Sequence, residues 1–328
     1  MVTLDEIRQP IEERIGEFET FVRKSFNERE GTLLAEMIEY ILSSRGKGLR
    51  PIVVMLAAQC VRPSLPFGQR TMLAAMLTEM IHTASLVHDD VIDESNLRRG
   101  RASVNARWQS RNAVIVGDYI LARNMNIGLK SGQFDLLNHI IGSMSILCEG
   151  ELLQSDHAAK LDINREAYFD IIYKKTASLF GTAASAGALS VGGSHDQISA
   201  MRDYGEALGM AFQIVDDILD YTPDAATGKP SANDLRERKI TLPLIEVLAV
   251  CSKEERSRIL ALVEQCNVSD EAVEEVRQWV EQGNGVAAAR KVLQRFLQRA
   301  MSALNSFDES PAREALLKLC CFVAERDR

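Results

Sequence analysis

The sequence predicts an all-α protein, because its apolar residues recur with the period of a helix. In the segment 71–90, "TMLAAMLTEMIHTASLVHDD", apolar residues repeat at three- and four-residue steps. The segment 198–221, "ISAMRDYGEALGMAFQIVDDILDY", repeats in the same way. No segment shows a convincing alternation of apolar and polar residues that would compete as a strand.

Proline marks where the predicted helices end. The sequence has eight prolines but none between residues 67 and 222, and proline is the residue that the interior of a helix tolerates least. That stretch therefore predicts several long helices, bounded by loops at 62–68 and 222–234. The run of small residues at 181–193, "GTAASAGALSVGG", predicts close packing between neighbouring helices.

The region after about residue 250 looks different but still helical. Segments such as "DEAVEEVRQWVEQG" predict shorter amphipathic helices. We find no linker, low-complexity tract or repeat of solenoid length. We therefore expect a single domain over residues 1–328, with a motif-bearing core at about 45–245 and short C-terminal helices at 246–328.

Composition excludes several classes of protein. The 328 residues carry a net charge of -8 and are 6% aromatic, which argues against a nucleic-acid surface. The N-terminus lacks the apolar region of a signal peptide, and no window holds 18 uninterrupted apolar residues. Six scattered cysteines without a CxxC pair indicate reduced thiols rather than disulfides or zinc. We expect a cytoplasmic protein with at most peripheral membrane contact.

Two acidic clusters of the same shape each lie at the C-terminal end of a long predicted helix. The first is D-D-V-I-D, with Asp89, Asp90 and Asp93, and the second is D-D-I-L-D, with Asp216, Asp217 and Asp220. Asp89 and Asp93 stack on one helical face, while Asp90 lies about 100° around the helix. Stacked carboxylates repel unless a cation lies between them, and Mg²⁺ combines one or two carboxylates with waters and phosphate oxygens.

A bland alternative is that each cluster is a solvated helix end. Two copies argue against it, and so does the helix dipole, which disfavours negative charge at a helix C-terminus. The residues alone therefore favour metal-assisted binding of a diphosphate.

Basic residues supply the complementary charge. "SSRGKGLRP" places Lys47 and Arg50 in a glycine-bracketed loop before a proline that starts a helix, where backbone NH groups favour an anion. This is not a Walker A loop, and neither is the segment around Lys229, because proline follows that lysine. His82 lies seven residues before Asp89, on the same predicted face. Other basic candidates are Arg98, Arg99, Lys174, Lys175, Lys229 and Lys239.

Four motifs in order resemble those of the trans-isoprenyl diphosphate synthases. "LVHDDVIDESNLRRG" resembles the first aspartate-rich motif of that family, and "GMAFQIVDDILDY" with "GKPSANDLRERKITLPL" resembles the second. "RGKGLRP" is similar to the family's GGKRLRP, and "YKKTASLF" to its lysine–threonine motif. Departures are Arg45, Gly48, Ala232 and Arg238, which affect loops rather than expected ligands.

The resemblance implies an isoprenoid-synthase bundle of long antiparallel helices around a central active-site cavity, acting as a homodimer. It implies Mg²⁺-dependent, head-to-tail condensation of isopentenyl diphosphate onto an allylic diphosphate such as farnesyl diphosphate. About three Mg²⁺ ions would serve each site with diphosphate bound, and Mn²⁺ would substitute.

The resemblance also assigns roles by motif position. The direct metal ligands would be Asp89, Asp93 and Asp216, assisted directly or through water by Asp90, Asp217 and Asp220. Isopentenyl diphosphate would be held by Lys47, Arg50, His82 and Arg99. The allylic diphosphate would be held by Arg98, Lys175, Thr176, Gln213, Lys229 and Lys239.

Product length is expected to depend on the side chains one helical turn before Asp89. These are Ala84 and Ser85, both small, whereas short-chain members of the family tend to have aromatic residues there. We therefore expect a long product between hexaprenyl and decaprenyl diphosphate, with octaprenyl diphosphate as the single choice, for quinone side chains. The alternatives are that both residues merely pack against a neighbouring helix, or that deeper groups shorten the product to farnesyl or geranylgeranyl diphosphate. The candidate deeper groups are Met76, Met80, Ile81 and Met125.

Three other functions remain open from the sequence. A class I terpene cyclase would have one aspartate-rich motif and an Asn/Ser/Glu triad. A non-catalytic subunit of a heteromeric synthase would be expected to lose aspartates, yet all six are present. A simple cation-binding helical protein would leave the ordered basic motifs unexplained.

Overall fold

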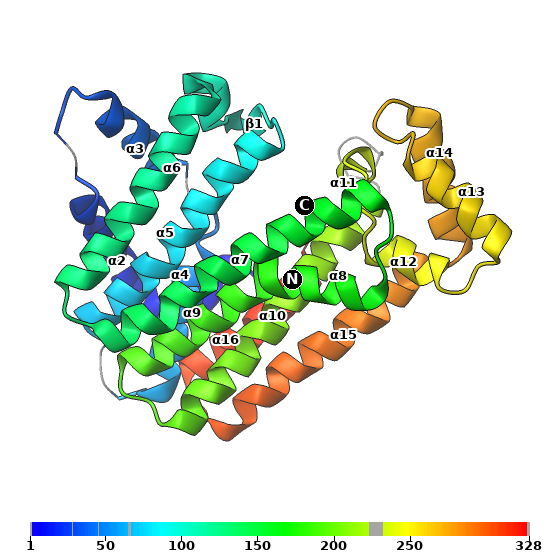
Figure 1. Cartoon of the computed structure of the whole chain (residues 1–328). Helices are drawn as coiled ribbons and strands as arrows, with labels where there is room; N and C mark the ends of the chain where they lie inside the picture. Colours follow the sequence, from blue (N-terminus) through cyan, green and yellow to red (C-terminus); the bar gives the residue numbers. More distant parts are fainter. Residues whose placement is uncertain (1, 28, 45, 65–66, 223–231, 327–328) are drawn as a thin grey trace.

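A computed structural model of the chain confirms the all-α prediction (Figure 1). It describes residues 2–27, 29–44, 46–64, 67–222 and 232–326. Within these residues, the strands are two residues each, β1 (Leu97–Arg98) and β2 (Arg101–Ala102), which pair antiparallel. No helix in these ranges is long and apolar enough to cross a membrane.

The helices of the N-terminal half are α1 (Leu4–Arg8), η1 (Gln9–Ile11), α2 (Glu12–Ser25), α3 (Leu33–Ser43), α4 (Leu49–Val61), α5 (Gln69–Ile92), α6 (Val104–Lys130) and α7 (Phe134–Lys160). Those that follow are α8 (Arg165–Ile172), η2 (Tyr173–Ala177), α9 (Ser178–Ser190), α10 (His195–Tyr221), α11 (Asn233–Arg236), α12 (Leu242–Leu248), α13 (Lys253–Val263), α14 (Asp270–Gln282), α15 (Gly285–Ala303), η3 (Leu304–Ser306) and α16 (Pro311–Ala324).

Small residues bring the central helices together, as the run at 181–193 predicts. A Cβ on Gly187 of α9 would lie 2.2 Å from the carbonyl oxygen of Val54 in α4. A Cβ on Gly205 of α10 would lie 2.3 Å from the carbonyl oxygen of Phe180 in α9. Real Cβ atoms do not approach that closely, so these glycines allow the backbones of α4, α9 and α10 to pack in contact.

The two long predicted helices that carry the aspartate clusters exist and end where the aspartates lie. α5 continues to Ile92 and α10 to Tyr221. α10 begins at a capping box, in which Ser194 accepts from the backbone of Gln197 and the side chain of Gln197 accepts from the backbone of Ser194. This cap satisfies NH groups that a helix start leaves without partners.

The expectation of short helices throughout the C-terminal region is wrong for α15, which has 19 residues and packs along α10 (Figure 1). Its buried stripe includes Val292, Leu293 and Leu297, with charged and polar residues on the outer face. That stripe runs without proline, so nothing in the sequence stops the helix.

The chain ends lie side by side. α16 packs against α1 and α4, and the backbone NH of Val2 donates to Glu325 at 3.3 Å. Leu316, Leu319 and Val323 are the buried side of α16. This packing directs the last described residues back toward the end of α10.

Candidate active site

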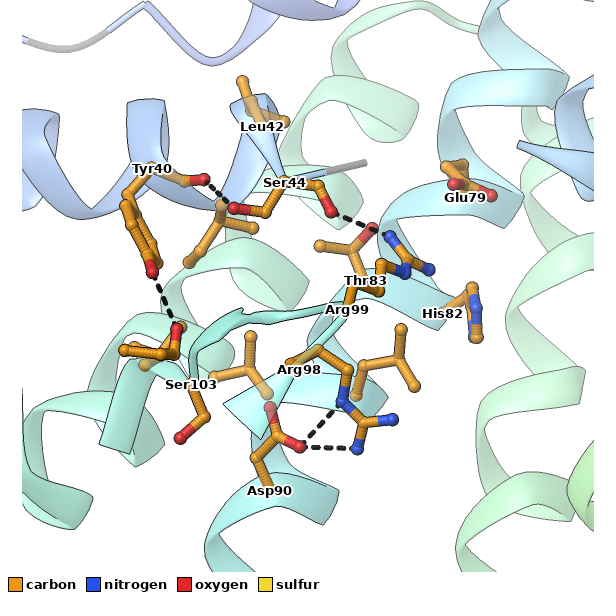
Figure 2. Close-up of a pocket in the computed structure, with 15 residues that line it drawn as sticks. Tyr40, Leu42, Ser44, Glu79, His82, Thr83, Asp90, Arg98, Arg99 and Ser103 are labelled. Atoms are coloured by element: carbon orange, nitrogen blue, oxygen red, sulfur yellow. Dashed lines mark hydrogen bonds and ion pairs between the residues drawn. The ribbon is translucent and has the colours of Figure 1, made fainter. Parts of the chain in front are cut away.

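The end of α5 carries the first aspartate motif, and β1 folds back over it. Arg98 of β1 donates through Nε to Asp90 Oδ1 at 2.8 Å and also through Nη2 (Figure 2). Asp90 is buried and Arg98 is half-buried. The arginine therefore neutralises the one aspartate of the motif that lies about 100° away from Asp89 on the helix.

A cavity beside this ion pair is rich in basic groups. It is lined by Glu79, His82, Asp90, Arg98 and Arg99, among others, whereas Asp89 does not line it (Figure 2). Burial lowers the pKa of His82 well below 6.5, and Arg50, Arg99 and Arg98 lower it further. A neutral histidine among cations leaves the cavity suited to an anion.

Arg50 lies in the first turn of α4, so the expectation that it belongs to a loop before a helix-starting proline is wrong. The helix begins at Leu49, and Gly48 precedes it in the left-handed region with φ +61. Burial lowers the pKa of Arg50 to about 10, and Glu79 opposes that effect. The guanidinium lies 4.5 Å from the ring centroid of Phe180, which favours the cation at a desolvated position.

Lys47 and Arg99 meet at the same loop. Arg99 donates to the carbonyl oxygen of Ser44 at 2.9 Å, and a Cβ on Gly46 would lie 2.4 Å from its Cζ. A side chain at 46 would therefore push the Arg99 guanidinium out of this position. Lys47 Nζ lies 5.1 Å from the ring centroid of Phe322 in α16. Arg50, His82 and Arg99 thus lie near one another. Lys47 instead lies nearer Arg326 and Asp216, which shift its pKa in opposite directions.

Asp89 has a different set of neighbours. Burial raises its pKa to about 7, repulsion from Glu151 adds to the rise, and Lys175 opposes it. Lys175 Nζ donates to Glu151 of α7 at 2.9 Å and to Gln154 at 2.8 Å. Asp89 and Lys175 are therefore close to each other, and neither lines the cavity that His82 lines.

A π-helical turn, η2, presents Lys175. Such turns are rare and occur often at functional sites. α7 accommodates it at Gly150, where a Cβ would lie 2.8 Å from the backbone nitrogen of Lys175. The preceding Lys174 instead pairs with Asp170 at 2.9 Å and lies 3.7 Å from Glu149.

The second aspartate motif divides into three environments. Asp216 accepts from Arg326 at 2.7 Å, and burial raises its pKa to about 6 although Arg326 and Lys47 oppose the rise. Asp217 is buried and accepts hydrogen bonds from side chains. Asp220 accepts the backbone NH groups of Asn233 at 3.1 Å and of Asp234 at 3.0 Å. Asp220 thus caps α11, a role that the sequence did not indicate.

Lys239 connects the two motifs. Its Nζ lies 3.6 Å from Asp93 and also pairs with Glu237. The backbone NH of Lys239 donates to the carbonyl oxygen of Asp234 at 2.7 Å. Since Asp234 in turn contacts Asp220, the ends of α5 and α10 lie on the same side of the molecule. Lys229, a predicted substrate ligand, lies outside the described residues.

The two residues expected to set product length lie in α5. Ala84 is fully buried, and Ser85 is half-buried with its hydroxyl donating to the carbonyl oxygen of His82 at 2.9 Å. Neither lines the two cavities beside the aspartate motifs. Met76 and Met80 are buried deeper in α5, as is Ile81, while Met125 on α6 is 37% exposed.

The carboxylates suit a hydrated divalent ion. Burial raises the pKa values of Asp89 and Asp216 because it disfavours their charged forms. A bound cation would stabilise the charged carboxylates. Over the ranges that the structure describes, no group of three or more His, Cys, Asp or Glu side chains is arranged to hold a metal by itself. Mg²⁺ fits this donor set because it retains waters and takes oxygens from a substrate phosphate.

Sequence reasoning missed several residues of the site. Glu151 and Gln154 stand in "EGELLQ", where two acids on an otherwise apolar helix were a usable signal. Asp234, whose pKa burial and repulsion from Asp217 raise well above its usual range, lies within a loop already singled out. Tyr168 and Arg326 carried no local signal, because their contacts depend on the packing of α8 and α16.

The fold and this site define an enzyme class that handles diphosphates between aspartate-rich helix ends. The polyprenyl synthetase family model matches residues 31–280, and the chain belongs to that family. It is 35% identical to the octaprenyl diphosphate synthase of Escherichia coli over 297 residues, 90% of this chain and 91% of that one. It is 32% identical to a short chain isoprenyl diphosphate synthase of Methanothermobacter thermautotrophicus, over 93% and 94% of the two chains.

The fold agrees with that assignment. A decaprenyl diphosphate synthase from Rhodobacter capsulatus superposes with a TM-score of 0.92 at 33% identity, over 99% of this chain and 100% of that chain. The chain is thus a member of a prenyltransferase family with long-chain relatives. Membership in this family argues against the terpene cyclase and simple cation-binding alternatives.

Proposed function

We propose that the protein is a Mg²⁺-dependent prenyltransferase that adds isopentenyl diphosphate head to tail to an allylic diphosphate. The primer is farnesyl diphosphate and the product is an all-trans polyprenyl diphosphate, octaprenyl diphosphate, for quinone side chains. The observation that carries the proposal is the position of Lys239, 3.6 Å from Asp93, which brings the two aspartate-bearing helix ends together. Two cavities near the helix ends contain basic residues: Arg98 and Arg99 line one, and Lys175 and Lys239 line the other.

Each of the two sets of basic residues binds the diphosphate of one substrate. The cavity that His82 and Arg99 line takes the diphosphate of isopentenyl diphosphate, with Arg50 close to His82 and Lys47 as a further ligand. Lys175 and Lys239, beside Asp89 and Asp93, take the allylic diphosphate, together with Arg98, Thr176, Gln213 and Lys229. Fixed positive charges on a departing pyrophosphate stabilise it as charge develops.

Metal ions would be held by Asp89, Asp93 and Asp216, because Asp217 and Asp220 are buried and accept hydrogen bonds that hold neighbouring segments in place. Asp216 would exchange its hydrogen bond with Arg326 for the metal. The family uses a divalent metal, and when bound it supplies positive charge to the leaving pyrophosphate. Asp90 contributes indirectly, by orienting Arg98.

The protein's remaining tasks are positioning and exclusion of water. The allylic cation formed on loss of pyrophosphate must stay dry until the alkene attacks it. The buried face of α5, including Ala84, provides an apolar surface below the aspartates. The proton lost at the end needs no side-chain base, because the departing pyrophosphate accepts it.

A long product is supported by the long-chain relatives. The small side chains at 84 and 85 agree with it, although neither lines the two cavities beside the aspartate motifs. The short-chain relative at 32% identity keeps a farnesyl or geranylgeranyl product as the second candidate.

We propose that residues 1–328 act as one domain in a homodimer. Large apolar side chains exposed on α6 and α7 support a self-association surface. They are Val114, Ile115, Met125, Leu129, Phe134 and Leu152. A heteromeric synthase with this chain as one subunit is the competing arrangement, and cytoplasmic location stays a prediction.

The test is turnover of labelled isopentenyl diphosphate by the purified chain with farnesyl diphosphate, with Mg²⁺ and after chelation. We expect incorporation that needs the metal and falls about 10²-fold or more in Asp89→Asn. The matched control is Asp118→Asn, since Asp118 is exposed on α6. Incorporation that appears only after another protein is added would favour the heteromeric arrangement.

A further inference from the structure

A buried tyrosine outside the four motifs contacts the second aspartate motif. Tyr168 belongs to α8, and its hydroxyl donates to Asp217 Oδ2 at 2.6 Å. Both residues are about 2% exposed. A hydrogen bond from a neutral donor to a buried carboxylate is among the stronger ones in proteins, and its loss leaves the carboxylate undersatisfied.

The other oxygen of Asp217 continues a chain of hydrogen bonds. Gln213 Nε2 donates to Asp217 Oδ1 at 3.1 Å, and Thr176 Oγ1 donates to Gln213 Oε1 at 2.9 Å. The amide of Gln213 therefore has a defined orientation, with its oxygen toward Thr176 and its nitrogen toward Asp217. This series of hydrogen bonds begins at the buried Tyr168 and ends at Thr176 in the π-helical turn.

The charged groups around Asp217 explain why its carboxylate needs the hydrogen bond from Tyr168 to stay in position. The nearby carboxylates of Asp216 and Asp234 repel it. One cavity is lined by Tyr168, Lys175, Gln213, Asp217 and Lys239. Without the hydroxyl, Asp217 would be drawn toward those lysines and would compete with a diphosphate for them.

We propose that Tyr168 is a positioning residue for the allylic diphosphate. It holds Asp217 away from Lys175 and Lys239 and, through Gln213, fixes the hydroxyl of Thr176. This inference rests on the proposed function, since it takes those lysines as the diphosphate's ligands.

The chain offers a matched control. Tyr173 also donates its hydroxyl to a carboxylate of α10, Glu206, at 3.1 Å, and it is likewise in contact with the core. Glu206 lies outside the aspartate motif, about three helical turns from Asp217. Tyr173→Phe therefore removes a hydroxyl–carboxylate contact from the same helix but not from the second aspartate motif. Tyr173 is less buried than Tyr168 and begins the turn that carries Lys175, so this control also reports any effect of disturbing that turn.

The first experiment compares Tyr168→Phe and Tyr173→Phe by steady-state kinetics, after thermal unfolding shows that both variants fold. We expect Tyr168→Phe to lower kcat/KM for farnesyl diphosphate about tenfold, the size seen when a residue that orients a ligand is lost. The KM for isopentenyl diphosphate should change less than about twofold, and Tyr173→Phe should match the unsubstituted protein. Equal kinetics in the two variants would overturn the proposal.

A double-mutant cycle tests whether Tyr168 acts through Asp217. Adding Tyr168→Phe to Asp217→Asn should cost no more than about twofold, because contacting residues in one network do not act additively. Losses that multiply would show that Tyr168 acts elsewhere, contrary to the proposal.

A binding measurement separates this inference from the proposed reaction. Calorimetric titration with inorganic pyrophosphate and Mg²⁺ should give about tenfold weaker binding in Tyr168→Phe. If the unsubstituted protein shows no turnover, the reaction is wrong, yet this titration still decides the role of Tyr168. Equal affinity in both proteins, or no binding to either, would overturn that role.

Discussion

The guanidinium of Arg326 lies 2.7 Å from the carboxylate of Asp216, so the C-terminal segment reaches into the site expected to bind metal. The same guanidinium lies 4.5 Å from the ring centroid of Phe212, one turn earlier in α10. A cation at this position and a metal ion on Asp216 would compete for one carboxylate.

Replacing Arg326 should therefore ease metal binding. We expect Arg326→Gln to lower the Mg²⁺ concentration for half-maximal activity about twofold to fivefold, in keeping with the up to ~1 kcal/mol of a partly exposed ion pair. The measurement is activity against Mg²⁺ concentration. Arg299→Gln, which removes an arginine from Asp203 on the same helix, is the control. An unchanged or raised Mg²⁺ requirement in Arg326→Gln would argue against competition.

The adjacent lysines of the π-helical turn should differ sharply in importance. Lys175 contacts Glu151 beside Asp89, whereas Lys174 contacts Asp170. We expect Lys175→Gln to lower kcat/KM for the allylic diphosphate about 10²-fold, because a fixed charge on the leaving group is lost. Lys174→Gln should stay within about twofold of the unsubstituted protein, since its partner Asp170 is exposed and the pair lies away from the aspartate motifs. Similar losses in both variants would contradict the assignment of Lys175.

His82 should make stability depend on pH. Its pKa in the folded protein is well below 6.5, so below that pH the unfolded chain takes up a proton that the folded chain does not. The stabilisation is present above about pH 6.5 and is lost as pH falls, by at most about 1.4 kcal/mol per pH unit. Groups facing His82 include Arg50, Arg98 and Arg99.

The measurement is the free energy of unfolding of the unsubstituted protein and His82→Gln between about pH 7 and pH 5. Buried carboxylates such as Asp89 and Asp216, whose pKa values are raised, change stability in the opposite direction. The difference between the two proteins therefore isolates His82, and it should shrink as pH falls. If the free energies of unfolding of the two proteins changed with pH in parallel, His82 would not be held neutral in the folded protein.

Ser85 gives the cleaner test of product length. We expect Ser85→Phe to shift the products to shorter chains, because an aromatic ring below Asp89 would narrow the space for a growing chain. Ala84 is fully buried, so a large residue there would also strain the core by about 1–3 kcal/mol. Product distribution is the measurement, and Ser85→Ala, which keeps the side chain small, should leave it unchanged. An unaltered distribution in Ser85→Phe would place the length control elsewhere.

Sequence periodicity was enough to locate α5 and α10 and to place six aspartates at their ends. Those features depend on local spacing, which a helix converts directly into position. The same geometry separates Asp90 from Asp89, and the structure pairs Asp90 with Arg98.

Contacts made by chain segments that are far apart could not be found in this way. Arg326 meets Asp216 because α16 packs on α1 and α4. Tyr168 meets Asp217 because α8 packs on η2, which in turn packs on α10. The π-helical turn at 173–177 depends on the absence of a side chain at Gly150, in another helix. Tertiary packing decides such features, and a single sequence does not record it.

The most direct test of the central proposal is the length of the product made by the purified chain from farnesyl diphosphate, excess labelled isopentenyl diphosphate and Mg²⁺. Products separated by chain length should form a ladder that ends near octaprenyl diphosphate. Arrest at farnesyl or geranylgeranyl length would contradict the long-chain assignment, and no incorporation from farnesyl or a shorter primer would contradict prenyl transfer by this chain alone.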